Sequence, residues 1–212
     1  EDKEKNVHYS LREQFTSEFD AWMQEKNDKQ RLVDGGQFEI GKTSEALKNI
    51  GMRDAKIYWR KSKIQYIMED HPAITPEIIK KVPSIVENPI IVMKSKTIDS
   101  SITMFGDIKA GDSYVMVAVE LNPTPAGGLE AEFNLISSAY DRSNNNAKNL
   151  IQTSEVLYLC DKKRADTLLM SLGVQFPSDQ QVYGSIGSIT YKDGKVNISG
   201  KKIFVDTSSK SV

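Results

Sequence analysis

From Pro89 onward the hydrophobic pattern changes from helical to extended, and this change constrains the fold more than any other feature of the sequence. Four segments with the apolar and β-branched content of strands follow one another, at 89–96, 100–108, 113–122 and 132–140. A hairpin turn (KAGD, 109–112) separates the second from the third, and a longer loop (NPTPAGG) separates the third from the fourth. Because no helical segment lies between them, consecutive strands must pair antiparallel. The sequence therefore predicts a central antiparallel meander.

The segments on either side of this meander are mainly helical. Ser10 and Glu13 form a capping box, which predicts that the first helix begins at Ser10. Its apolar stripe consists of Leu11, Phe15, Phe19 and Met23, with Trp22 beside it. Short strands are expected at 37–41 and 56–60, helices at 45–50 and 62–71, and further short helices from Thr75 to Val86. After the meander we expect a helix at 146–153, a strand at 155–160 and a helix capped by Asp161.

Near the end of the chain, Asp193-Gly194 is a strong signal for a two-residue hairpin turn. Since helices come first and strands later, the predicted class is α+β, with N-terminal helices packed on a central antiparallel β-meander and a C-terminal helix and hairpin. We divide the chain into a docking helix segment (1–41), a central α+β domain (42–180) and a C-terminal hairpin extension (181–212).

Composition excludes several classes of protein. The 212 residues contain no apolar run of the roughly 20 residues needed to span a bilayer, so we expect no membrane association. There is no phosphate-binding glycine loop, and two histidines cannot form a multi-histidine metal site, so neither cofactor nor metal is expected. The single Cys160 ends an apolar run and is interpreted as a buried structural thiol. The chain opens with Glu-Asp-Lys-Glu-Lys, from which we expect a domain excised from a larger polypeptide.

Charge is distributed unevenly along the chain. Residues 42–97 carry 11 Lys+Arg against 6 Asp+Glu, whereas residues 1–41 carry 6 against 10. A basic middle segment between acidic neighbours could form a positive face for phosphates, although a solvated helix surface would have the same composition.

Three groups of residues could bind or cleave a phosphodiester. His71 stands at a helix end before Pro72, where imidazole can act as an acid or a base near neutral pH. A strand ending in Lys94, Ser95, Lys96 and Thr97 offers cations and hydroxyls, although lysines on a strand can also serve as edge protection. Ser138, Tyr140 and Arg142 share one face of another strand, and Asn144 follows. A guanidinium and hydroxyls in one row suit a phosphate, but a solvated strand end would look similar.

The order of several motifs resembles the C-terminal domain of phage MuF-like proteins. The resemblance extends from Tyr9 to Pro177 and rests on YSLREQFTSEFDAWM, FEIGKTSEALKNIGM, IMEDHPAITPEIIKKVPSIVENPIIVMKSKT, VMVAVELN, SSAYDRSN and EVLYLCDKKRADTLLMSLGVQFP. This family of phages and integrated mobile elements is assigned to the barnase–EndoU–colicin–RelE group of metal-independent ribonuclease folds. The resemblance therefore implies a nuclease or toxin fold.

The family pattern can be placed on the sequence position by position. It has a helix-end His before Pro (His71-Pro72), an Asn/Asp-Pro before the first sheet strand (Asn88-Pro89), and two strand-end patterns. These are Lys94, Ser95 and Thr97 in one strand and Ser138, Tyr140 and Arg142 in the other. The sequence departs from the pattern at Asp141-Arg142-Ser143, where the family has Gly-basic-Asp, so the identity of the basic residue is open.

The mechanism implied by the resemblance is cleavage of RNA through attack by its own ribose 2′-OH. His71 would be the acid or base, and Lys94 and Arg142 would stabilise charge on the phosphorane. Tyr140 would stack on a base or donate a proton, and Ser138 would position the phosphate, with Ser95, Lys96, Thr97 and Asn144 as further substrate-binding residues.

The expected partners are RNA, such as tRNA or another structured RNA, and an immunity protein that spares the producer. The expected site of action is the cytoplasm, after delivery by a virion or by secretion.

Two other functions remain open. A catalytically inactive binding or adaptor module could have the same fold, and an enzyme acting on another phosphate-bearing substrate, such as an ADP-ribosyl transferase, is a third hypothesis. A nuclease requires His71, Lys94, Ser138 and Arg142 to converge on one cleft, whereas a binding module would leave them scattered and expose an apolar patch.

Overall fold

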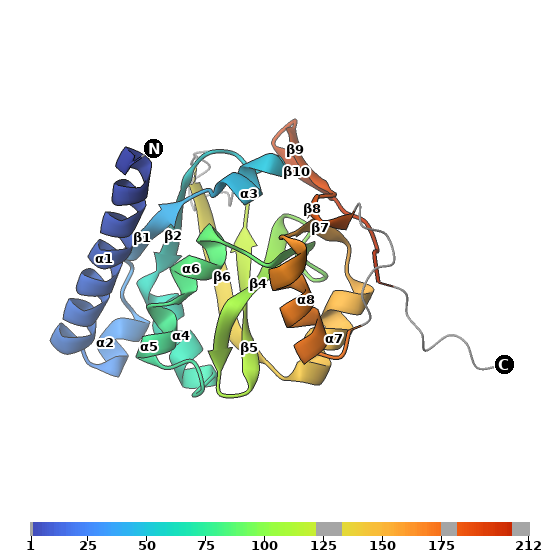
Figure 1. Cartoon of the computed structure of the whole chain (residues 1–212). Helices are drawn as coiled ribbons and strands as arrows, with labels where there is room; N and C mark the ends of the chain where they lie inside the picture. Colours follow the sequence, from blue (N-terminus) through green and yellow to red (C-terminus); the bar gives the residue numbers. More distant parts are fainter. Residues whose placement is uncertain (1, 122–132, 175–181, 205–212) are drawn as a thin grey trace.

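The computed structural model describes residues 2–121, 133–174 and 182–204, which form an eight-stranded sheet covered by helices, with a separate two-stranded hairpin (Figure 1). The strands of the large sheet follow the order β1-β2-β6-β5-β4-β3-β7-β8. Within the part of the chain that the structure describes, no helix has both the length and the apolar character needed to cross a membrane.

The predicted meander forms the centre of the sheet. Its strands pair antiparallel with their sequence neighbours, as expected from the absence of helices between them. They are β3 (Ile91–Lys94), β4 (Ser101–Ala110), β5 (Ser113–Glu120) and β6 (Phe133–Arg142). The α+β prediction is confirmed.

The short N-terminal strands extend this meander in a way that the sequence did not indicate. β1 (Gln37–Lys42) and β2 (Lys56–Arg60) pair antiparallel with each other, and β2 pairs parallel with β6. The parallel register aligns Lys56 with Phe133 and Trp59 with Ile136. At the opposite side, β7 (Val156–Leu159) pairs with β3 and with the two-residue β8 (Gly184–Ser185).

Helices cover both faces of the sheet because strand residues alternate between two hydrophobic clusters. Val115 and Val117 of β5 face a cluster shared with α4 (Lys61–Asp70), α6 (Val82–Glu87) and α1 (Asp2–Glu25). Tyr114 and Met116 face a second cluster shared with α7 (Asn144–Thr153) and α8 (Lys162–Ser171). The remaining short helices are α2 (Asp28–Leu32), α3 (Glu45–Asn49) and α5 (Pro76–Ile79).

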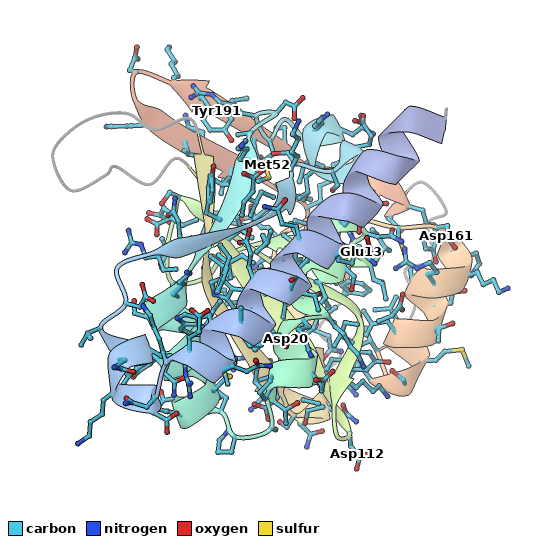
Figure 2. All side chains as sticks on the ribbon, turned by 90° about the vertical axis from the view of Figure 1, so that its left-hand side faces the viewer. Glu13, Asp20, Met52, Asp112, Asp161 and Tyr191 are labelled. Atoms are coloured by element: carbon cyan, nitrogen blue, oxygen red, sulfur yellow. The ribbon has the colours of Figure 1, made fainter. Side chains whose placement is uncertain are left out.

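Helix α1 lies along the β1 edge of the sheet, where it crosses the front of the molecule in Figure 2. Phe15, Phe19 and Trp22 are buried against Phe38 of β1, with ring centroids 5.5 to 6.2 Å apart. The predicted apolar stripe therefore docks on the core. The helix begins at Asp2, however, so the prediction that it begins at Ser10 is wrong, because the upstream residues continue the helix.

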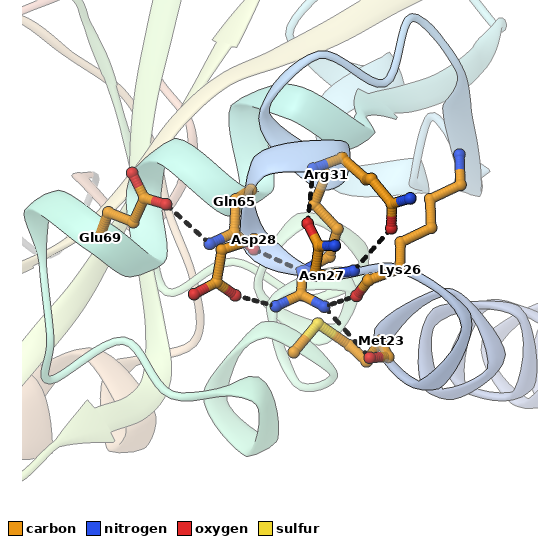
Figure 3. A network of polar contacts seen from close by, with 8 residues as sticks. Met23, Lys26, Asn27, Asp28, Arg31, Gln65 and Glu69 are labelled. Carbon is orange, nitrogen blue, oxygen red and sulfur yellow. Dashed lines mark hydrogen bonds and ion pairs between the residues drawn. The ribbon is translucent and has the colours of Figure 1, made fainter.

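A polar network centred on Arg31 fixes the segment that follows α1 (Figure 3). The buried guanidinium donates to Oε1 of Gln65 on α4 (2.6 Å), to the carbonyl of Met23 (3.1 Å) and to the carbonyl of Lys26, and it pairs with Asp28. Arg31 therefore ties the end of α1 and helix α2 to α4.

The C-terminal hairpin forms as the Asp-Gly signal predicts. β9 (Ser188–Lys192) pairs with β10 (Lys195–Ser199) around Asp193 and Gly194, both of which have positive φ. The backbone N–H of Ile189 in this hairpin donates a hydrogen bond to the carbonyl oxygen of Ile50 (2.6 Å).

The hairpin sits on the turn after α3, and Gly51 makes this close approach possible. Gly51 has a φ of +92°, and a Cβ there would lie 2.2 Å from the carbonyl oxygen of Ile189. Arg53 stacks on the Tyr191 ring at 4.1 Å, near the top of Figure 2.

Candidate functional site

His71 lies where α4 ends beside the final residues of β6. It is the C-cap of α4: its N–H donates to the carbonyl of Ile67 (2.8 Å), and Pro72 prevents the helix from continuing. Helix α4 packs along β6, which brings His71 Nδ1 to 3.5 Å from Oδ1 of Asp141. The side chains of His71 and Asp141 are 35% and 30% exposed, so the pair is accessible from solvent.

Asp141 is the functional candidate that the sequence analysis missed. In the sequence it appeared only as a departure from the family pattern, next to Arg142. The available signal was strand alternation, because Asp141 follows the buried Ala139 on the face covered by α4. An acidic residue in that row can meet a residue at the end of α4.

Arg142 lies at the same end of the sheet but on its other face. Its register partner is Tyr114, whose hydroxyl is 2.8 Å from Ser171 of α8, whereas the partner of Asp141 is Val115 on the α4 face. Tyr114 also pairs with Lys109, whose Nζ lies 4.5 Å from the Tyr114 ring centroid. The structure thus adds Lys109 as a second cationic residue at this end.

The other residues of the predicted β6 site have defined backbone positions. Ser138 and Tyr140 pair with Ala118 and Met116, but their side chains lie outside the described ones. Asn144 is exposed and begins α7, directly after the N-cap Ser143.

Lys94 lies at the opposite end of the sheet from His71 and Arg142. It pairs with Ile102 of β4, which pairs with Val119 of β5, whereas the β5 partner of Arg142 is Tyr114. Tyr114 lies five residues from Val119, or about 17 Å at 3.3 Å per residue. The expectation that Lys94 converges with His71 on one cleft is therefore not met. The reason is topological. Neighbouring strands of a meander alternate in direction, so β3 and β6, which are three strands apart, have their C-termini at opposite ends of the sheet.

The residues after Lys94 shape a tight turn. Ser95 Oγ accepts hydrogen bonds from the backbone N–H groups of Thr97 and Ile98, both at 3.3 Å, and lies 3.4 Å from the Thr97 hydroxyl. The exposed Lys96 contacts the hydroxyl of Thr153 at the end of α7. The hydroxyls of Ser95 and Thr97 therefore have a structural role, because they form the turn that follows β3.

Asn88 has a comparable structural role. Arg164 of α8 donates to its side-chain oxygen (2.8 Å) and to its carbonyl (3.1 Å), and it also pairs with Asp107 of β4 (2.8 Å). One arginine thereby links α6, β4 and α8.

Neither a metal site nor a reactive thiol is found among the described side chains. They include no cluster of three or more His, Cys, Asp or Glu residues able to hold a metal ion. Cys160 is buried, and this burial raises the pKa of its thiol to about 11, which disfavours a nucleophilic thiolate.

A sequence model of the phage MuF C-terminal domain matches residues 43–166, which is more than half of the chain. The chain belongs to this family. No curated protein and no solved structure matched. The matched part of this phage MuF C-terminal domain contains both His71 and Asp141, whereas α1, β1 and the β9–β10 hairpin lie outside it.

Proposed function

We propose that this MuF C-terminal domain is a metal-independent endoribonuclease, with His71 as its acid or base and Asp141 as the residue that orients it. The observation that supports this most is the 3.5 Å approach of His71 Nδ1 to Asp141 at a partly exposed position. A carboxylate next to one ring nitrogen holds the imidazole in one orientation and tautomer, so that the other nitrogen can accept a proton.

The proposed reaction needs no metal because the substrate supplies the nucleophile. The 2′-oxygen attacks phosphorus while His71 takes its proton, and the phosphorus–O5′ bond breaks as the 5′-oxygen takes a proton from water. The products are a 2′,3′-cyclic phosphate and a 5′-hydroxyl. Arg142 and Lys109 lie at the same end of the sheet as His71 but on its other face, so their side chains would have to reach around the end of the strands to stabilise charge on the phosphorane.

The test is a gel of total bacterial RNA incubated in EDTA with the full chain, with His71→Ala and with Lys94→Ala. We expect cleavage by the wild type and by Lys94→Ala, which alters the opposite end of the sheet, but none by His71→Ala. Circular dichroism would establish that each variant is folded. Equal cleavage by His71→Ala and the wild type would overturn the proposal.

The second candidate function is an adaptor module that binds a partner without catalysis. It is favoured by the positions of two predicted cations: Lys94 is separated from His71 along the sheet, and Arg142 lies on the other face. Intact RNA in every lane, with folded protein, would support this candidate.

The biological setting remains part of the proposal. A nuclease of a phage or mobile element would act as a toxin in the cytoplasm after delivery by a virion or by secretion, and would require an immunity protein in its producer. Expression of the wild type in bacteria should then arrest growth, whereas expression of His71→Ala should not.

A further inference from the structure

A pocket of about 440 Å³ opens at the beginning of α4, the helix whose other end carries His71. This volume lies within the range of ordinary ligand sites. Helices α2 and α4 lie side by side (Figure 1), and residues of both line the pocket. Its lining includes Leu32, Arg60, Lys63, Tyr66, Glu120 and Ile136.

The pocket brings together apolar side chains that are left in contact with water. Tyr66 is 49% exposed and Leu32 is 37% exposed. Single exposed apolar residues are common, but here two of them line one concave site. The Nζ of Lys63 lies 5.0 Å from the Tyr66 ring centroid, and a hydrogen bond to Asp70 raises the pKa of the Tyr66 phenol. The ring is therefore neutral and available for stacking.

The cationic residues at this pocket are not explained by helix stability. Arg60, Lys61 and Lys63 open α4, and its first turn contains no acidic residue. Positive side chains at the start of a helix oppose its dipole. Lys61 lies over the Phe38 ring at 4.6 Å, but among the described residues neither Arg60 nor Lys63 forms an ion pair. Their charge is thus available to an anion.

We infer that this pocket binds one or two nucleotides of single-stranded RNA. A base would stack on Tyr66 beside Leu32, and Arg60 and Lys63 would contact the flanking phosphates, an arrangement typical of single-strand binding. The inference rests on the proposed ribonuclease function and adds a substrate subsite to it.

Two further features define what the subsite binds. Glu120 can accept a hydrogen bond from the exocyclic amino group of cytosine, adenine or guanine, which uracil lacks. The ten residues of α4 place His71 about 15 Å away at 1.5 Å per residue, a distance that a few nucleotides can span. Within this subsite the phosphate contacts belong to the first turn of α4, where Arg60 and Lys63 lie.

The test measures binding separately from cleavage. A fluorescent ten-nucleotide RNA with 2′-O-methyl riboses lacks the nucleophile, so its anisotropy reports affinity alone. We expect Arg60→Gln/Lys63→Gln to weaken binding at least tenfold. The slope of log K against the logarithm of the salt concentration should become shallower by about 1.4, the value for two lost phosphate contacts on a single strand. Tyr66→Ala should weaken binding about 5- to 160-fold, while Tyr66→Phe stays within about twofold. Oligo(C) should bind more tightly than oligo(U), and Glu120→Ala should remove this preference.

The matched control is Lys192→Gln/Lys195→Gln, which removes two exposed charges from the β9–β10 hairpin. Melting temperatures would identify any variant that fails to fold. Unchanged affinity in the pocket variants, an equal loss in the control, or competition by polyglutamate as strong as by RNA would overturn the inference.

The gel assay keeps this inference distinct from the proposed function. If RNA binds through Tyr66 but is never cut, the subsite stands and the ribonuclease proposal fails. If cleavage depends on His71 while the pocket variants bind normally, the ribonuclease proposal stands and the subsite fails.

Discussion

The carboxylate of Asp141 and the imidazole of His71 come from segments far apart in the chain, and they meet because α4 packs along β6. His71 can be singled out from the sequence, because it is an imidazole at a helix end and matches the His-Pro of the family pattern. The sequence cannot mark Asp141, because the contact depends on which strand α4 lies against. The same limit explains why Lys94 was grouped with His71: a strand-end pattern gives residue types, but strand direction in the sheet decides which ends are neighbours.

Asp141→Asn should lower the rate of RNA cleavage about 100-fold or more, because the amide cannot hold the imidazole in the same tautomer or stabilise its charged form. Rate constants for a defined oligoribonucleotide would measure this. Lys94→Gln is the matched control and should cleave at the wild-type rate. A wild-type rate in Asp141→Asn would show that the pair has no role in catalysis.

Asp34 makes folding stability depend on pH. Its carboxylate accepts hydrogen bonds from Lys26 (2.5 Å), the backbone of Gly36 (2.9 Å) and the Trp22 indole (3.0 Å). These contacts, that with Lys26 first, lower the pKa of Asp34 from 3.8 to about 2. The stabilisation, about 1–2 kcal/mol, is fully present above the unfolded pKa near 4 and is lost as pH falls toward 2.

Asp34→Asn should therefore reduce the free energy of unfolding by about 1–2 kcal/mol at pH 7, and this difference should disappear as pH falls from 4 to 2. Urea unfolding at several pH values would measure it. A difference that stayed constant over that range would contradict the assignment.

At the scale of helices and strands, local signals predicted most elements correctly. The meander, the Asp193-Gly194 hairpin and the Asp161 cap, which accepts from the N–H of Arg164 (3.1 Å), all depend on residues close in sequence. The parallel pairing of β2 with β6 depends on residues far apart, and no periodicity within either strand specifies it. The start of α1 was missed because a capping-box pattern also fits inside a helix.

The hydrogen bond from Arg31 of α2 to Gln65 of α4 gives a prediction at this scale. Arg31→Met should lower the free energy of unfolding by about 2–4 kcal/mol, because it leaves the buried oxygens of Gln65 and Met23 without their donor. Lys29→Met, on the exposed side of α2, is the control and should change stability by less than about 0.5 kcal/mol. Urea unfolding monitored by tryptophan fluorescence would compare them.

For the whole molecule, the larger hydrophobic cluster joins the three segments into which we divided the sequence. It contains Phe15 and Phe38 from the first, Trp59 from the second, and Ile189 and Ile198 from the third. The division into 1–41, 42–180 and 181–212 remains a prediction, and shortened chains can test it.

A chain trimmed to residues 43–174 should fail to fold stably, because it exposes the β2 edge and loses the aromatic residues of α1 and β1. Circular dichroism and thermal melting, with the full chain as reference, would measure this. A cooperative transition near that of the full chain would show that the family-matched part is independent.

The parallel pairing of β2 with β6 also determines when this protein can acquire its structure during synthesis. β2 is complete once residue 60 leaves the ribosome, but its partner begins at residue 133, so more than 70 further residues must be translated first. The β9–β10 hairpin, whose Ile189 N–H donates to the Ile50 carbonyl, forms later still. Contacts of such sequence separation form slowly. The nascent chain therefore stays without its finished sheet, and without the α4–β6 contact that joins His71 to Asp141, until most of it has been made.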